Sequence, residues 1–216
     1  MKAIRSFLIG CLLATGAAYA QLGNFKMPTL QYNPGLLFDP NVKKDMNISD
    51  AQSQKLQTAL ITAMKPMMGK PGAAGGTDQM IGMVDTMQKT ILPLLSPSQR
   101  TRLHQITLQS YGPKALADPK VGAEVGLSAQ QQATIKHKLE TIAKDAAKGM
   151  QGKKMGSTPQ SMMGNMGAVQ ELQKKINDES IKQIYPILTA KQRATWTKLQ
   201  GRPITLSPMF KSLLGG

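Results

Sequence analysis

The chain has 216 residues, enough for one sizeable domain or two small ones, and carries a net charge of +15 with one cysteine. A single cysteine excludes a disulfide within the chain and a metal site built from several thiolates. The strong positive charge favours anionic partners, such as lipid head groups, acidic polymers or acidic unfolded chains.

The first twenty residues have the pattern of a secretory signal peptide. Lys2 and Arg5 precede an apolar run, and the run ends in the small-x-small sequence of residues 18–20. We therefore expect cleavage after Ala20 and export, which disfavours nucleic acid as a partner. Cleavage there would also remove Cys11 and leave no thiol for catalysis.

A second interpretation of this segment is a lipoprotein signal. Leu8 to Cys11 resemble a lipobox, in which the cysteine would be lipidated. The apolar stretch between Arg5 and Cys11 is too short for the hydrophobic region of such a signal. Ordinary cleavage is the favoured prediction, and lipidation at Cys11 is the alternative.

The remaining chain is predicted to be all-α, because apolar residues recur at helical spacing and no long segment alternates with a period of two. Residues 21–46, rich in proline, are expected to form an irregular N-terminal arm that packs Leu36, Leu37 and Phe38 onto the body. Helices are expected from Ser49 to about Pro66, over 77–92, from Ser96 to about 111, from Ser128 to about 148, over 168–187 and from Thr189 to Gly201. A short helical turn is expected at Asp118 and Pro119, and an extended C-terminal tail over 201–216.

One short pattern occurs at four of these helix starts. An aliphatic residue precedes Ser or Thr, and a glutamine follows three residues later. This is a capping box, in which the hydroxyl and the glutamine each satisfy one backbone amide, and the cap contributes about 1 kcal/mol. We interpret the eight residues as structural helix caps without catalytic chemistry: Ser49, Gln52, Ser96, Gln99, Ser128, Gln131, Thr189 and Gln192.

The four phrases fall into two pairs. Residues 93–106 align with residues 186–199, and in both segments the helix start follows a proline. We therefore predict two related halves over 47–112 and 127–200, built as helical hairpins and joined by a linker over 113–126.

The phrase at residues 184–192 resembles the LTxxQ signature of the Spy/CpxP family of small exported helical proteins. Thr189 and Gln192 match the signature strictly, whereas serine replaces threonine at Ser49, Ser96 and Ser128. The resemblance is closest over 127–200. It implies an ATP-independent periplasmic chaperone or envelope-stress protein, which forms dimers and holds unfolded clients on a concave basic surface.

Members of that family typically carry the signature twice, and this chain carries it four times. One chain could therefore imitate the family's dimer and work as a monomer.

The methionines suggest a competing function. Thioethers bind Cu(I), so a metal-handling envelope protein is an alternative. Its candidate ligands are Met64, Met67, Met68, Met80, Met83 and Met87. Methionine also fills helix stripes and makes adaptable surfaces, and Lys65 and Lys70 would repel a cation, so we favour the packing interpretation.

No arrangement of residues in the sequence indicates an enzyme or a cofactor. The acidic residues form no obvious pair for acid–base work, and His104 and His137 lack a helical partner with ligand character. The leading hypothesis is a client-binding chaperone-like protein for unfolded envelope proteins. A structural envelope protein without clients is a further alternative.

Overall fold

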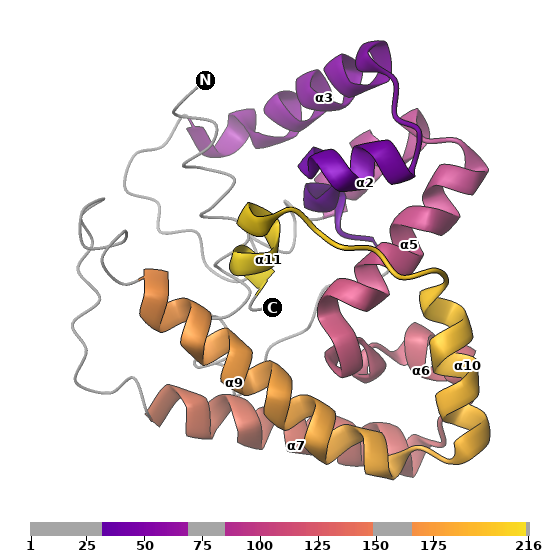
Figure 1. Cartoon of the computed structure of the whole chain (residues 1–216), viewed down its shortest axis with the longest axis vertical. Coiled ribbons are helices and arrows are strands. Elements are labelled where there is room, and N and C mark those ends of the chain that lie inside the picture. Colours follow the sequence, from indigo (N-terminus) through magenta and orange to yellow (C-terminus); the bar gives the residue numbers. More distant parts are fainter. Residues whose placement is uncertain (1–31, 69–84, 149–165, 215–216) are drawn as a thin grey trace. The chain divides into compact units, whose positions relative to one another are not determined.

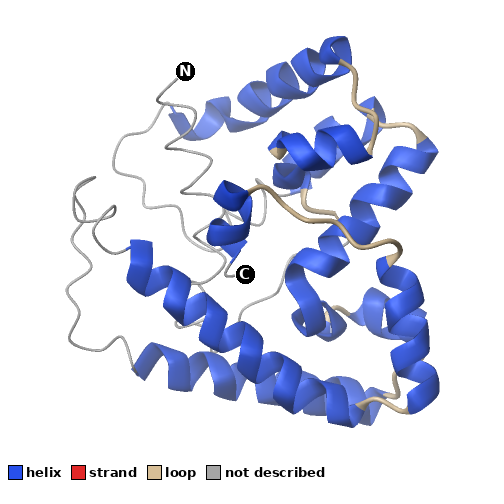
Figure 2. Cartoon of the chain, viewed as in Figure 1, coloured by secondary structure: helices blue, strands red, loops and turns tan. Residues whose placement is uncertain are grey.

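The computed structural model describes residues 32–68, 85–148 and 166–214. Within these ranges the regular structure is α-helix and 3₁₀-helix, with no strand (Figure 2). The all-α prediction is confirmed for this part of the chain. None of its helices has the length and apolar character needed to cross a membrane.

The chain divides into two compact units, each of which is described by itself. The N-unit contains the described residues between 32 and 109, together with 199–207. The C-unit contains the described residues between 110 and 198, together with 208–214. Each unit therefore includes residues that lie outside the halves expected over 47–112 and 127–200.

The N-unit begins with two short helices that the sequence interpretation missed. Residues 21–46 were expected to be irregular, but the 3₁₀-helix η2 covers Pro34–Phe38 and helix α2 covers Pro40–Asp45. Each begins with a proline in its first turn after a capping side chain, Asn33 for η2 and Asp39 for α2. Both helices are too short to show an apolar repeat in the sequence, so their caps are the local signal of a helix start.

Longer helices complete the N-unit (Figure 1). They are α3 over Asp50–Met68 and α5 over Pro97–Tyr111, whose last residues belong to the C-unit. Between them lie a helix whose described part covers 85–91 and the short 3₁₀-helix η3 over Leu92–Leu94. Helix α3 continues past Pro66, where its end was expected. The buried core side chains include Leu36, Leu37, Val42, Leu56, Leu60, Leu103, Ile106 and Leu108.

The C-unit is organised around a helical hairpin. Helix α7 covers Ala129–Lys148 and helix α9 covers Met166–Ile184, and the two lie side by side (Figure 1). Ile142 and Ala146 of α7 pack against Ile176 of α9, with Leu172 at the edge of this cluster. Ile142, Leu172 and Ile176 belong to the apolar spacing from which the two helices were predicted.

The expected linker over 113–126 is also helical. The 3₁₀-helix η4 covers Gly112–Ala117 and contacts both α7 and α9, and helix α6 covers Pro119–Val125. The helical turn predicted at Asp118 and Pro119 is therefore the start of α6. Its neighbour η4 is stabilised by the burial of Pro113, Ala115 and Leu116. These residues form no apolar repeat from which the helix could have been predicted.

The C-unit ends with three shorter elements. They are the 3₁₀-helix η5 over Tyr185–Ile187, helix α10 over Ala190–Gln200, which ends in the N-unit, and helix α11 over Pro208–Leu214. In the tail expected to be extended over 201–216, residues 201–207 contain no helix or strand. The prediction is wrong for α11, which starts at a proline and buries Phe210. Trp196 of α10 is completely buried, and its Nε1 donates to the hydroxyl of Tyr185 at 3.2 Å.

Candidate functional site

The four signature phrases all lie at helix starts. In each, the hydroxyl accepts a hydrogen bond from the backbone amide three residues on: Ser49 from Gln52 at 3.2 Å, Ser96 from Gln99 at 3.2 Å, Ser128 from Gln131 at 3.1 Å and Thr189 from Gln192 at 3.2 Å. In three of them the glutamine Oε1 also accepts from the amide of the capping residue at 3.0 Å, namely Ser96, Ser128 and Thr189. These three have the reciprocal geometry of a capping box.

The glutamines of the four phrases also pair with one another. Gln52 and Gln99 exchange side-chain hydrogen bonds of 2.8 and 3.1 Å within the N-unit. Gln131 and Gln192 exchange two of 2.9 Å within the C-unit. We call each of these cyclic amide pairs a glutamine clamp, because it joins two helix starts that are distant in the sequence.

Each clamp also reaches the backbone of the segment that leads into the opposite helix. Gln52 donates to the carbonyl of Leu94 at 2.8 Å and Gln99 to that of Met46 at 3.2 Å. In the C-unit the carbonyl acceptors are Ile187 for Gln131 and Gly126 for Gln192, at 3.0 and 2.8 Å.

The clamps explain why the pattern uses glutamine rather than glutamate. A primary amide offers two donor hydrogens and two acceptor lone pairs. Gln99, Gln131 and Gln192 each use all four positions, since each Oε1 accepts two bonds and each Nε2 donates two. A carboxylate could accept but could not donate, so glutamate could not complete the clamp.

The segments before the first phrase of each unit share a second pattern. Residues 33–52 align with 112–131 without a gap, and both segments contain an Asp-Pro pair followed by a buried valine. Asp39 caps α2 by accepting from the amides of Asn41 and Val42. Asp118 caps α6 in the same way.

The two short helices also end alike. Asn47 follows α2 with φ of 51°, and Gly126 follows α6 with φ of 76°. Both residues lie in the left-handed region, which glycine and asparagine adopt most readily. The amide of the next residue then bonds back to the helix, from Ile48 to the carbonyl of Lys43 and from Leu127 to that of Gly122, both at 2.9 Å or less.

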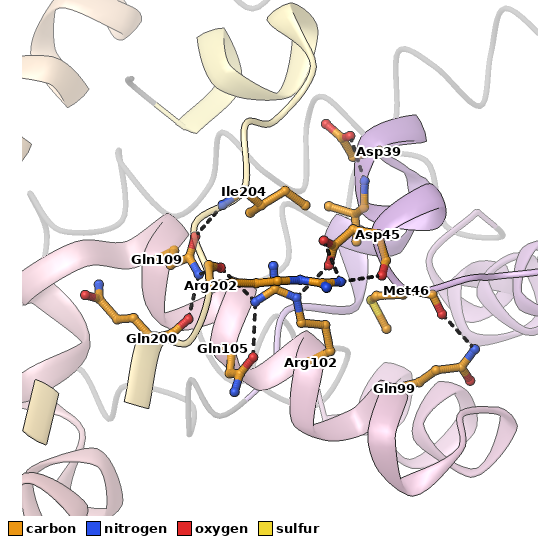
Figure 3. A network of polar contacts seen from close by, with 11 residues as sticks. Asp39, Asp45, Met46, Gln99, Arg102, Gln105, Gln109, Gln200, Arg202 and Ile204 are labelled. Atoms are coloured by element: carbon orange, nitrogen blue, oxygen red, sulfur yellow. Dashed lines mark hydrogen bonds and ion pairs between the residues drawn. The ribbon is translucent and has the colours of Figure 1, made fainter. Parts of the chain in front are cut away.

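A network of polar contacts in the N-unit centres on Asp45 (Figure 3). Its carboxylate contacts Nε of the buried Arg102 at 2.6 Å and Nη2 of Arg202 at 2.9 Å. Burial favours the neutral form of Asp45, but the hydrogen bond and charge of Arg102, with the charge of Arg202, outweigh burial and hold its pKa below the usual value. Asp45 is therefore an anchor for two guanidinium groups.

Through this network the segment 199–207, which we call the strap, is fixed to α2 and α5. Gln109 Nε2 donates to the carbonyls of Gln200 and Arg202, and Gln109 Oε1 accepts from the amide of Ile204 (Figure 3). At the far end, Asp39 accepts from both the amide and the hydroxyl of Ser207 at 2.8 Å. Gly201 has φ of +63°, and the strap therefore leaves α10 through a conformation that suits glycine.

One lysine of the C-unit has a pKa lowered by burial. Lys114 lies in η4, and burial lowers its pKa to about 8. An ammonium that loses water without gaining an anionic partner prefers the neutral form. Lys114 therefore carries a partly neutral amine at mildly alkaline pH.

The candidate metal ligands remain largely unplaced. Met80 and Met83 lie outside the described residues, and the side chains of Met64, Met67 and Met68 lie outside them as well. Met87 is buried, which agrees with the packing interpretation of that residue. In the described ranges, no group of three or more His, Cys, Asp or Glu residues could hold a metal ion.

Sequence reasoning placed the caps but missed the clamps and the strap. A capping box uses only the oxygen of the glutamine side chain, so the unassigned Nε2 donors were a usable signal for a further partner. The strap offered no comparable signal, because its partners lie about a hundred residues away or more.

Comparison with protein-family models, curated proteins and solved structures gives no match to this chain.

Proposed function

We propose that this protein is exported to the periplasm, where it holds unfolded envelope proteins without ATP or a cofactor. The observation that carries the proposal is the paired glutamine clamp, since each unit contains two signature-type helix starts joined by their glutamines. The signature is the feature by which the chain resembles the Spy/CpxP family. Four copies in one chain support the proposal that a monomer of this protein corresponds to a dimer of that family.

The charge distribution supports an electrostatic contribution to client capture. Lys136 and Lys144 of α7 and Lys191 and Lys198 of α10 are exposed, and no described acidic group forms an ion pair with them. Exposed charges of one sign attract oppositely charged chains over a distance and raise the association rate. Acidic unfolded segments are the clients that these lysines would capture fastest.

The test is the aggregation of a denatured client diluted into buffer without ATP, followed by light scattering, with the chain from residue 21 onward present or absent. Suppression at near-stoichiometric amounts that weakens with added salt would support the proposal. No suppression across several acidic and basic clients would contradict it.

A comparison of Lys→Gln and Lys→Arg variants separates electrostatic capture of clients by the lysines from binding that does not depend on charge. The triple variant Lys136→Gln, Lys144→Gln, Lys191→Gln should hold acidic clients less well, whereas the corresponding Lys→Arg variant should retain activity. Equal activity of the two variants would remove the lysines from the mechanism. A measured mass of twice the monomer would count against the single-chain imitation of a dimer.

A further inference from the structure

The strap is held mainly by its backbone. Its carbonyl groups accept four bonds from side chains of α2 and α5: Gln200 from Gln109 at 2.6 Å, Arg202 from Gln109 at 2.8 Å and from Arg102 at 2.9 Å, and Thr205 from Asn41 at 2.9 Å. Its amides donate two more, from Ile204 to Gln109 at 3.0 Å and from Ser207 to Asp39 at 2.8 Å.

In the described structure, side chains of the strap make hydrogen bonds or ion pairs at two positions. Arg202 contacts the carboxylate of Asp45 at 2.9 Å and its carbonyl at 3.0 Å, and the Ser207 hydroxyl donates to Asp39. Proline has no amide hydrogen, but Pro203 costs the strap no hydrogen bond, because the amides that donate are those of Ile204 and Ser207. Most of the hydrogen bonds that hold the strap therefore involve groups that any extended polypeptide has.

The four residues that contact the strap's backbone combine donors and acceptors suited to a peptide backbone. Asn41, Arg102 and Gln109 donate to carbonyl groups, while Asp39 and Gln109 accept from amides. Arg102 has an additional buried Nη2 that has no hydrogen-bond partner in the described structure. Backbone hydrogen bonds give affinity without sequence selection, as in other modes of binding extended peptides.

We propose that these residues of α2 and α5 form a binding surface for extended, unfolded polypeptide, and that the strap occupies it as an internal stand-in for a client. The inference rests on the proposed function and names a client surface for it. A client segment displaces the strap and takes over its backbone contacts. Since the strap is tethered next to the surface, its effective concentration is high and it competes with clients.

Weakening the strap should therefore strengthen the binding of a peptide. The probe is a fluorescently labelled nonapeptide with the sequence of residues 200–208, and binding to the whole protein is followed by anisotropy. In the double variant Arg202→Ala, Ser207→Ala, the strap loses its side-chain contacts, and we expect this variant to bind the peptide at least about 10-fold more tightly than the unaltered protein.

Two further comparisons test whether the backbone is recognised. A peptide methylated on the amide nitrogens that correspond to Ile204 and Ser207 should bind the double variant about 10-fold less tightly, because two donors are lost. Adding Gln109→Leu to the double variant should reduce binding similarly, whereas adding Gln54→Leu, an exposed residue of α3, should not. Circular dichroism would verify that each variant is folded.

Equal peptide binding by the unaltered protein and the double variant, or indifference to amide methylation, would overturn the inference. Concentration-dependent dimers without peptide binding would overturn it in favour of straps exchanged between two copies.

The aggregation assay on the same variants separates this inference from the proposed function. If clients are held equally well by all variants and the peptide does not bind, the strap inference alone fails; if peptide binding follows the expected pattern and no client is held, the proposed function alone fails.

Discussion

The side-chain amides of Gln131 and Gln192 donate to each other's oxygen, and both N···O distances are 2.9 Å. The two residues cap different helices, α7 and α10, so one pair of side chains fixes the relation between the two helix starts. The N-unit repeats the arrangement with Gln52 and Gln99. The signature is therefore a device that joins helix starts as well as a set of helix caps.

Replacement of Gln192 by glutamate should destabilise the C-unit. The Nε2 of Gln192 donates to the carbonyl of Gly126 and to Oε1 of Gln131. A carboxylate oxygen there would face two acceptors, and the loss should be about 2–3 kcal/mol. Urea unfolding followed by the fluorescence of Trp196, the one tryptophan of the chain, measures it. Gln130→Glu, at an exposed position of α7, is the control, and equal losses in the two variants would argue against the clamp.

The two glutamines of the N-unit clamp should be energetically coupled. In a double-mutant cycle of Gln52→Ala and Gln99→Ala, the double variant should lose less stability than the two single variants together, because each single change already breaks the pair. We expect a coupling free energy of about 1 kcal/mol, measured by urea unfolding followed by circular dichroism. A parallel cycle of Gln54→Ala with Gln99→Ala should be additive, since Gln54 is exposed. Additivity in both cycles would rule out the pairing.

Stability should fall in acid partly through Asp45. Its pKa is lower in the folded protein than the usual value of 3.8, so the ionised group stabilises the fold above that value. This contribution is lost as the pH falls from 3.8 towards the lower folded-state pKa, because the unfolded chain then binds the proton more readily. Asp45→Asn should be less stable than the unaltered protein at pH 7, and the gap should narrow below pH 3.8. Urea midpoints between pH 2.5 and 7 check this, and a constant gap would contradict it.

Lys114 should add a second rise of stability with pH, in the alkaline range. Its pKa is about 8 in the folded protein and 10.5 for an ordinary lysine, so the unfolded chain binds more protons between these values. The free energy of unfolding should rise by about 1–3 kcal/mol from pH 8 to 10.5. Lys114→Met should be more stable at pH 7 and lack this rise, whereas Lys120→Met, at an exposed position, should keep it. The same rise in Lys114→Met would assign it to another group.

The sequence was sufficient to locate the long helices, because their signals are local. The cap at Ser128 and the apolar residues Ile135, Leu139 and Ile142 all lie within one helix, and the structure buries the three apolar residues. The short helices α2 and α6 span too few residues for a hydrophobic period. Their local signal is the Asp-Pro pair, which was interpreted as a helix start at Asp118 and overlooked at Asp39.

The clamps and the strap could not be predicted from local patterns. Whether Gln131 contacts Gln192 depends on the path of some sixty residues between them, and no rule of helix capping specifies that path. The strap is more difficult still, since Ser207 pairs with Asp39 across most of the chain. Side-chain contacts to an extended backbone also leave no periodic trace in the sequence.

The central claim is that the protein binds polypeptides because they are unfolded. The most direct measurement is the anisotropy of a labelled globular protein, in its native form and after reduction and carboxymethylation, titrated with the chain from residue 21 onward without ATP. The account predicts saturable binding of the unfolded form, weaker binding at high salt and no binding of the native form. Equal binding of both forms, or binding of neither, would contradict it.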